Sequence, residues 1–445
     1  MQLRGFIVLI VACLAFSSLT AALDVADNWP TWRGPTPNGI ALKGDPPTEW
    51  SETRNVKWKV EIDGSSTSTP IIWGDKLFIQ TASPSAEEPK PAAPEATAEG
   101  RRRRGPPRGP TPTVPWKFNV VCLDRNTGEV IWEKTAREEI PHEGHHATGS
   151  FASYSPVTDG EKLWASFGSR GLHCYDLDGN QQWSADLDQM KIRMRFGEGS
   201  SPALAGDAVI VVQDHEGQSK IVAFNKDTGE IIWERDRQEM TSWTTPLVIE
   251  HEGKLQIIAN ATRRIQSYDA ETGDVIWECG GMTVNSIPTP VHGFGNVYCT
   301  SGFRGSALKA IELGHTGDLT DTDAIKWEVG EGTPYVPSPV LYDDKIYVTS
   351  GNKPVISCYN AETGEPYYVE QKIDGLSTLY ASPVGAGGHV YIADRKGNFA
   401  VLEHGDDYKV IANNALDDVF DASPVVIGDV LYLKGLKSIY CIASE

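Results

Sequence analysis

The chain has 445 residues, of which 22% are charged and 40% are hydrophobic, so it is long enough to bury a large core. Acidic residues outnumber basic residues by 60 to 40, which gives a net charge of -20. This balance argues against a general nucleic-acid-binding protein, because such a protein needs a basic surface.

Residues 1–22 have the features of a signal peptide. Arg4 precedes an apolar run at 6–16 that is too short to span a bilayer, and small residues follow up to Ala22. We therefore expect an exported protein, periplasmic or secreted, with no transmembrane segment. A lipoprotein signal ending at Cys13 is the competing interpretation, because residues 10–13 (IVAC) fit that pattern, but this signal would be unusually short.

Residues 23–54 form an N-terminal leader that contains the stretch WPTWRGP at 29–35. Further along, residues 83–115 form a low-complexity insertion rich in Pro, Ala and Glu, with four consecutive arginines at 101–104. Such a composition cannot bury enough apolar surface to order itself, so we predict a disordered loop between two strands.

Three histidines, His142, His145 and His146, follow on a glycine-containing loop. No carboxylate pattern completes a metal site beside them, and the spacing is not that of a helix face. Hydrogen bonding at the surface or along a channel is therefore favoured over metal binding, and we assign no metal site.

One repeat organises the rest of the chain. A Ser-Pro or Thr-Pro step opens an apolar run eight times, with one spacing of 86 residues and the others of 41 to 49. The prolines of these steps are Pro70, Pro156, Pro202, Pro246, Pro290, Pro339, Pro383 and Pro424. Each unit reads as four short strands separated by Gly and Asx turns, which is typical of a propeller blade.

We therefore predict an all-β, eight-bladed β-propeller of four-stranded antiparallel blades over residues 55–445, with the insertion in its first blade. The last unit has only three strands, and residues 55–60 (NVKWKV) supply the missing fourth strand. Pairing these two ends of the chain closes the ring and leaves no free sheet edge.

A bulky aromatic recurs in the fourth strand of the units, where it is expected to fill the wedge between neighbouring blades. The tryptophans at this position are Trp132, Trp183, Trp233, Trp277 and Trp327. Six cysteines follow the signal peptide, and four of them share one position of the repeat: Cys122, Cys174, Cys358 and Cys441. Equivalent strands of different blades lie too far apart for disulfides, so we expect buried free thiols.

Several turns have the pattern Asx-x-x-Thr-Gly-acid-x-x-Trp, with their glycines at Gly128, Gly229 and Gly273. With these turns, the Ser/Thr-Pro steps and the leader, residues 28–442 resemble the pyrroloquinoline-quinone-repeat (quinoprotein-like) β-propellers. That group includes quinone-dependent alcohol dehydrogenases and the propeller lipoprotein of the outer-membrane protein assembly machinery. Its dehydrogenases hold pyrroloquinoline quinone (PQQ) between a tryptophan and a ring of two adjacent cysteines, beside calcium. This chain has no Cys-Cys pair, so the resemblance leaves PQQ with calcium unsupported and the cofactor open.

On one face of a propeller, the segments that cross between blades meet the loops between second and third strands. Seven of these eight loops carry Lys or Arg, which predicts a channel mouth that attracts anions. The candidate ligand-binding residues are Arg170, Arg263, Arg304, Lys353, Arg395, Trp243, Tyr335 and Tyr380.

Two functions follow from this reasoning. The favoured one is a non-catalytic binding or scaffold protein for a protein partner or a small anionic ligand, with no catalytic residues assigned. The alternative is a PQQ-dependent alcohol or sugar dehydrogenase, which the missing Cys-Cys pair and the absence of long loops disfavour. We expect a monomer in either case.

Overall fold

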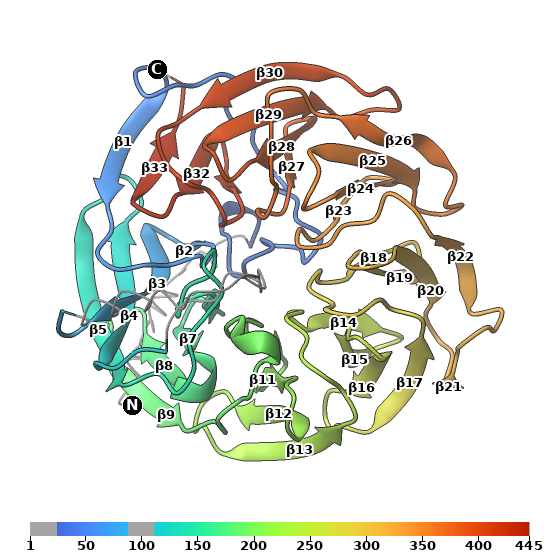
Figure 1. The fold of residues 1–445 in the computed structure, drawn as a ribbon, viewed down its shortest axis with the longest axis horizontal. Coiled ribbons are helices and arrows are strands. Elements are labelled where there is room, and N and C mark those ends of the chain that lie inside the picture. Colours follow the sequence, from blue (N-terminus) through green and yellow to red (C-terminus); the bar gives the residue numbers. More distant parts are fainter. Residues whose placement is uncertain (1–24, 88–110, 445) are drawn as a thin grey trace, which may run out of the picture.

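The computed structural model describes residues 25–87 and 111–444 (Figure 1). The predicted signal peptide, Cys13 and the arginine run at 101–104 lie outside the described residues. Eight sheets stand in a ring, each with four antiparallel strands and one with a short fifth strand, which confirms the predicted eight-bladed propeller. The helices of the described residues are three short 3-10 helices, η1 (Val25–Asp27), η2 (Gly168–Arg170) and η3 (Arg193–Arg195), and none could cross a membrane.

Within each blade the strands follow one another from the central channel to the rim. Blade 1 consists of β2 (Ile71–Trp73), β3 (Lys76–Pro84), β4 (Trp116–Asp124) and β5 (Val130–Glu139). Blade 2 consists of β6 (Val157–Thr158), β7 (Lys162–Ser166), β8 (Leu172–Asp176) and β9 (Gln181–Ala185). Blade 3 consists of β10 (Ala203–Ala205), β11 (Ala208–Gln213), β12 (Ser219–Asn225) and β13 (Ile231–Arg237). Blade 4 consists of β14 (Leu247–His251), β15 (Lys254–Ala259), β16 (Arg264–Asp269) and β17 (Val275–Gly280), with β21 (Gly317–Asp318) added in parallel.

The second half of the ring repeats this order. Blade 5 consists of β18 (Val291–Gly293), β19 (Asn296–Ser301), β20 (Ala307–Glu312) and β22 (Ile325–Val329). Blade 6 consists of β23 (Val340–Tyr342), β24 (Lys345–Thr349), β25 (Val355–Asn360) and β26 (Pro366–Lys372). Blade 7 consists of β27 (Val384–Ala386), β28 (His389–Ala393), β29 (Asn398–Glu403) and β30 (Val410–Ala415). Blade 8 consists of β31 (Val425–Ile427), β32 (Val430–Lys434), β33 (Ser438–Ile442) and β1 (Val56–Glu61), and β1 pairs antiparallel with β33.

The turns before the fourth strands explain why a glycine recurs there. In blade 1, the Asp124 carboxylate accepts the N–H groups of Asn126 and Thr127 at 2.7 and 3.1 Å, which caps the turn. Gly128 then closes the turn with a φ of 78° and donates its N–H to the Asp124 carbonyl. That backbone conformation favours glycine because it has no Cβ to clash.

Each of these turns also forms the contact between neighbouring blades. Five indoles of fourth strands donate Nε1–H to a carbonyl in the corresponding turn of the next blade, at 2.9 to 3.1 Å. These indoles belong to Trp58, Trp132, Trp183, Trp233 and Trp327. The rings lie directly against the turn glycines, so that a Cβ added to Gly229 would lie 2.5 Å from the Trp183 ring. The tryptophans therefore fill the space between blades, as expected.

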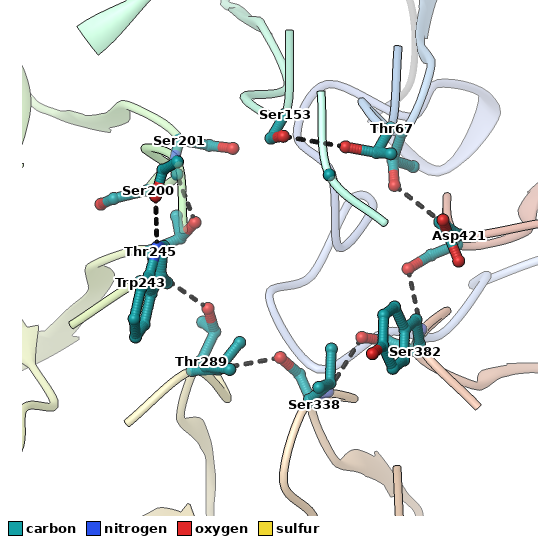
Figure 2. A pocket seen from close by; sticks show the side chains of 18 of the residues that line it. Thr67, Ser153, Ser200, Ser201, Trp243, Thr245, Thr289, Ser338, Ser382 and Asp421 are labelled. Atoms are coloured by element: carbon teal, nitrogen blue, oxygen red, sulfur yellow. Dashed lines mark hydrogen bonds between the residues drawn. The ribbon is translucent and has the colours of Figure 1, made fainter. Parts of the chain in front are cut away.

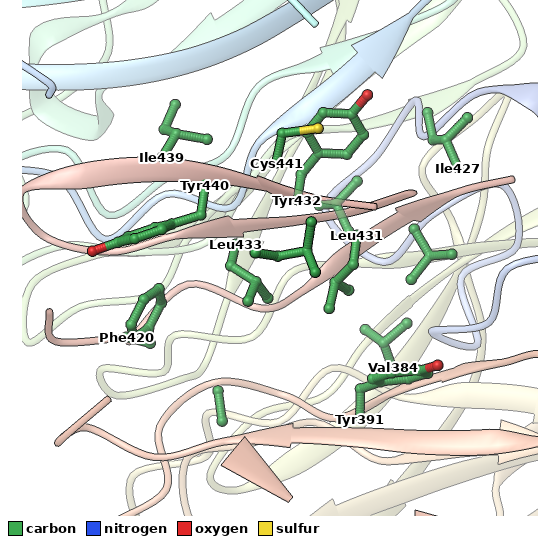
Figure 3. Packing of buried hydrophobic residues seen from close by; sticks show 14 of the residues in the cluster. Val384, Tyr391, Phe420, Ile427, Leu431, Tyr432, Leu433, Ile439, Tyr440 and Cys441 are labelled. Atoms are coloured by element: carbon green, nitrogen blue, oxygen red, sulfur yellow. The ribbon is translucent and has the colours of Figure 1, made fainter. Parts of the chain in front are cut away.

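Buried apolar side chains fill the interior of the blades and the spaces between them. Figure 3 shows the packing between blades 7 and 8, where Val384 and Tyr391 lie opposite Leu431 and Leu433. All six described cysteines are buried and free, as predicted. Four of them lie in the third strands of different blades, β4, β8, β25 and β33.

The leader is not part of any blade. Its described residues cross the centre of the ring on the face of the first-to-second-strand turns and bind the first hairpins of six blades (Figure 1). The hydrogen-bonded pairs join Trp29 to Ile72, Pro30 to Thr158, Asn38 to His292 and Leu341, Ala41 to Gly385, and Asp45 to Asp429. The leader thus closes one end of the central channel.

The predicted insertion at 83–115 begins later than expected. Ser83 and Pro84 belong to β3 and pair with Lys117 and Trp116 of β4, and Ser85 donates its N–H to the Pro115 carbonyl at 2.8 Å. At the end of this ladder the Trp116 ring packs against Phe151, with the ring centroids 4.8 Å apart.

Candidate functional site

A cavity of about 530 Å³ lies in the central channel (Figure 2). The segments that cross between blades supply most of its wall, and the loops between second and third strands add Phe303 and Asn352. Trp32 is the contribution of the leader, which closes the channel at the opposite end. The cavity is therefore open on the face that the sequence predicted and has its floor on the leader.

Aromatic side chains surround the cavity, including all three that the sequence proposed. Trp243, Tyr335 and Tyr380 are half-buried in its wall. The indole of Trp243 donates Nε1–H to the Gly197 carbonyl at 2.8 Å, and Tyr335 stacks on Phe303 with ring centroids 4.8 Å apart. These contacts fix the rings, so that their free faces and edges are available to a ligand.

A ring of hydroxyl groups surrounds the channel below these aromatics (Figure 2). Each blade contributes the Ser or Thr that precedes its first proline, and the backbone N–H of each donates to the hydroxyl oxygen of the next blade. The eight bonds run from Thr69 to Ser155 (2.9 Å), Ser155 to Ser201 (2.9 Å), Ser201 to Thr245 (3.0 Å), Thr245 to Thr289 (3.2 Å), Thr289 to Ser338 (2.9 Å), Ser338 to Ser382 (2.9 Å), Ser382 to Ser423 (3.1 Å) and Ser423 back to Thr69 (3.0 Å). We call these eight residues the hydroxyl ring. All eight are buried and line the cavity.

Sequence reasoning did not identify the hydroxyl ring, although its signal was present. A Ser/Thr-Pro step marks every member of the ring, but the hydroxyl groups of these steps were not predicted to line the channel. A residue before proline is held in an extended conformation, which places successive blades' residues in equivalent positions around the axis.

Two of the predicted basic residues are engaged with carboxylates of the site. Arg170 is buried, and its Nη1 lies 2.7 Å from Oε1 of Glu198, a cavity residue. Ser169 adds its backbone N–H and its hydroxyl to the same carboxylate. Arg395 holds Asp421 through two hydrogen bonds of 2.6 and 3.0 Å and lies 4.5 Å above the Tyr380 ring. Both pairs are neutral overall, so neither arginine offers a free charge to a ligand.

The other three predicted basic residues, Arg263, Arg304 and Lys353, are exposed. Arg304 lies 5.3 Å from the Phe303 ring, Lys353 lies 4.0 Å from Glu370, and Arg263 donates to the Gln238 carbonyl at 3.3 Å. None of the five basic residues is in the cavity lining. The structure thus places the three predicted aromatics around the cavity, and the predicted basic residues do not converge with them.

The three histidines near the mouth have other partners. His142 Nε2 contacts the Met190 carbonyl at 2.7 Å, and His145 and His146 contact the His146 carbonyl and Thr148 through Nδ1. Burial lowers the pKa of His146, with Arg395 and His145 adding to the shift. Within the described part of the chain, no three His, Cys, Asp or Glu side chains are grouped as metal ligands.

Comparison with known proteins places the chain in a structural group. Residues 117–312 match the family model described as outer membrane protein assembly factor BamB. Among curated proteins no sequence matches the chain.

Solved structures resemble the whole propeller. BamB from Moraxella catarrhalis is 16% identical over 87% of this chain and 97% of its own, with a TM-score of 0.57. The quinohemoprotein alcohol dehydrogenase from Comamonas testosteroni is 10% identical over 95% of this chain and 81% of its own (TM-score 0.64), and a europium-containing methanol dehydrogenase is 9% identical over 94% and 98% (TM-score 0.61). At these identities the likeness shows the fold alone. The chain has the fold and repeats of the pyrroloquinoline-quinone-repeat (quinoprotein-like) β-propellers, the group that its sequence resembles.

Proposed function

We propose that this chain is an exported, non-catalytic binding protein that takes an anionic small molecule, or an acidic segment of a protein partner, into the channel cavity. One observation carries the proposal: a cavity of about 530 Å³ combines fixed aromatic rings with hydroxyl donors, while its two carboxylates are held by arginines. Such a wall binds a flat or extended ligand by stacking and hydrogen bonding. Both acids of the lining are paired, and its one basic side chain is His146, whose Nδ1 contacts Thr148 and whose pKa is lowered by burial.

The residues present do not fit the dehydrogenase alternative. Glu198 and Asp421 are the carboxylates of the cavity, and both are paired with guanidinium groups instead of being free to bind calcium. The six described cysteines lie apart and none follows another in sequence. Trp243 could stack on a quinone, but the cavity lining that the structure describes contains no cysteine and no carboxylate without an arginine partner.

A protein partner is compatible with the same face. The similarity to BamB, an outer membrane protein assembly factor, supports a role in protein binding at an outer membrane. Exposed Arg263, Arg304 and Lys353 stand on loops around the mouth and would meet an acidic segment first. We propose a monomer, because the pairing of β1 with β33 completes the last blade and the ring has no blade that lacks a strand.

The proposal is tested by calorimetric titration with PQQ, an aromatic tricarboxylate, with and without calcium. We expect saturable one-to-one binding that does not depend on calcium and that weakens about tenfold or more in Trp243→Ala. Trp73→Ala is the matched control, because Trp73 is also half-buried but lies outside the cavity. Arg304→Ala should weaken binding by a few-fold through lost long-range attraction.

The outcomes separate the two functions. Heat no larger than that of dilution would contradict a small aromatic anion as ligand and would direct the search to a protein partner. Calcium-dependent binding, followed by oxidation of alcohols in a dye-linked assay, would refute the non-catalytic role in favour of the dehydrogenase.

A further inference from the structure

We infer that the hydroxyl ring, together with Arg33 beneath it, is an oxyanion-binding subsite at the floor of the channel cavity. The subsite would receive a carboxylate, phosphate or sulfate group of whatever the cavity binds. The inference rests on the proposed function and specifies which end of the ligand enters first.

The ring is arranged to donate hydrogen bonds. A hydroxyl has one proton and two lone pairs, and in each ring member one lone pair already accepts the N–H of the neighbouring blade. Across the described residues, no ring hydroxyl donates its proton to a protein acceptor within hydrogen-bond distance. Eight O–H groups of buried side chains are therefore available on the cavity side.

Arg33 places a positive charge next to this ring. Its side chain is 2% exposed, and it donates Nη1 to the Pro383 carbonyl at 3.0 Å and Nη2 to the Pro339 carbonyl at 2.7 Å. These two prolines directly follow the ring members Ser382 and Ser338 in the sequence. Its neighbour Trp32 lines the cavity itself.

The charge of Arg33 is not balanced by an acid. No carboxylate among residues 25–87 and 111–444 forms an ion pair with Arg33, and its Nε has no hydrogen-bond partner. Burial lowers the pKa of Arg33 to about 9, which still leaves it charged at pH 7. A buried cation without a counterion is costly, and an anion bound above it would recover part of that cost.

The same features disfavour a cation as the ligand. A metal ion or ammonium group needs oxygen lone pairs, of which the ring has already committed one per hydroxyl, and Arg33 would repel it. The two carboxylates of the wall are neutralised by Arg170 and Arg395. The donors and the uncompensated charge both point to an oxyanion.

Inorganic sulfate is the probe for this subsite, because it is fully ionised at neutral pH and carries no aromatic ring. We expect one sulfate per chain by calorimetry at low ionic strength. The double variant S338A/S382A removes the two hydroxyls nearest the carbonyls that Arg33 binds, and sulfate affinity should fall by tenfold or more, since hydrogen bonds to charged groups are the strong ones.

The matched control is Ser357→Ala. Ser357 is also buried and its hydroxyl also accepts a backbone N–H, that of Glu370 at 2.9 Å, but it lies in β25 outside the cavity. This variant loses one hydroxyl–amide bond of the same kind, where the double variant loses two, and it should keep its sulfate affinity. Arg33→Met should abolish sulfate binding, and its melting temperature shows whether the leader still docks.

Four outcomes of these titrations support or overturn the oxyanion subsite. Sulfate binding that falls in S338A/S382A but not in S357A supports the subsite. Equal sulfate affinity in all these proteins would place the ion elsewhere and overturn it. PQQ binding without any sulfate binding would overturn the subsite and leave the proposed function intact. Binding of neither probe would overturn the subsite and would leave the protein partner as the remaining form of the proposed function.

Discussion

The contact between a turn glycine and the tryptophan of the preceding blade can be tested with two matched substitutions. Gly273 and Gly295 both have a φ of 72°, so an added methyl group meets the same backbone strain, about 1–2 kcal/mol, at either position. Around Gly295 no atom lies within 4 Å of the added Cβ, whereas at Gly273 it would lie 2.5 Å from Cε3 of Trp233. That indole is buried and also bonded to the Ala270 carbonyl at 2.9 Å, so it cannot move freely.

We therefore expect Gly295→Ala to cost about 1–2 kcal/mol of unfolding free energy and Gly273→Ala about 2–5 kcal/mol, the difference being the overpacking of the blade contact. Equilibrium urea unfolding followed by far-ultraviolet circular dichroism measures both. The wild type and both variants should show a single transition with the same slope. Equal losses in the two variants would mean that the indole yields to the methyl group, and the rigid contact between blades would be refuted.

Three further predictions concern buried polar groups. Arg395→Ala should cost about 3 kcal/mol of unfolding free energy, measured with urea, because it leaves the Asp421 carboxylate buried without its partner. Adding Asp421→Asn to this variant should restore part of the lost stability. If it restores none, the ion pair does not contribute the stability assigned to it. Burial lowers the pKa of Lys434 to about 7, so between pH 7 and pH 10 the unfolded chain binds more protons than the folded protein and stability should rise with pH. Lys434→Met should flatten this rise in the urea midpoint. A rise of the same steepness in the variant would mean that other groups cause it. Burial raises the pKa of Cys174 to about 12, so the six described thiols should react with Ellman's reagent at pH 8 only after unfolding, and reaction in the folded protein would reveal an exposed thiolate.

The sequence predicted the parts of the fold that the repeat determines locally. The Ser/Thr-Pro steps locate the first strand of every blade, and the Asx-x-x-Thr-Gly turns locate the third and fourth strands. The contact between Trp183 and Gly229 could not be predicted from the repeat, because it depends on how one blade packs against the next. The same limit applies to the leader, whose sequence shows no strand period and whose contacts with the blades join residues far apart in the sequence.

The candidate site was predictable only in its outline. The aromatic residues Trp243, Tyr335 and Tyr380 were found because crossing segments must meet at the channel. The loop position of each arginine follows from the sequence, but the direction of its side chain does not. Arg170 and Arg395 pair with the carboxylates of Glu198 and Asp421, and sequence position alone does not show that these groups lie close together. A long, flexible side chain pairs with an opposite charge that lies close to it in space, and the folded structure determines which charge that is.

The leader has a consequence for the order in which the protein assembles. Arg33 is made well before its acceptor, the Pro383 carbonyl, which comes 350 residues later. At about 5–20 residues per second, a ribosome needs roughly 18–70 s to cover that distance. During this time β1 lacks β33, and the leader lacks the last blades that it binds. The leader is thus made before the last blades that it binds, and the growing chain must keep β1 unpaired and the three leader tryptophans, Trp29, Trp32 and Trp50, soluble until blade 8 is complete.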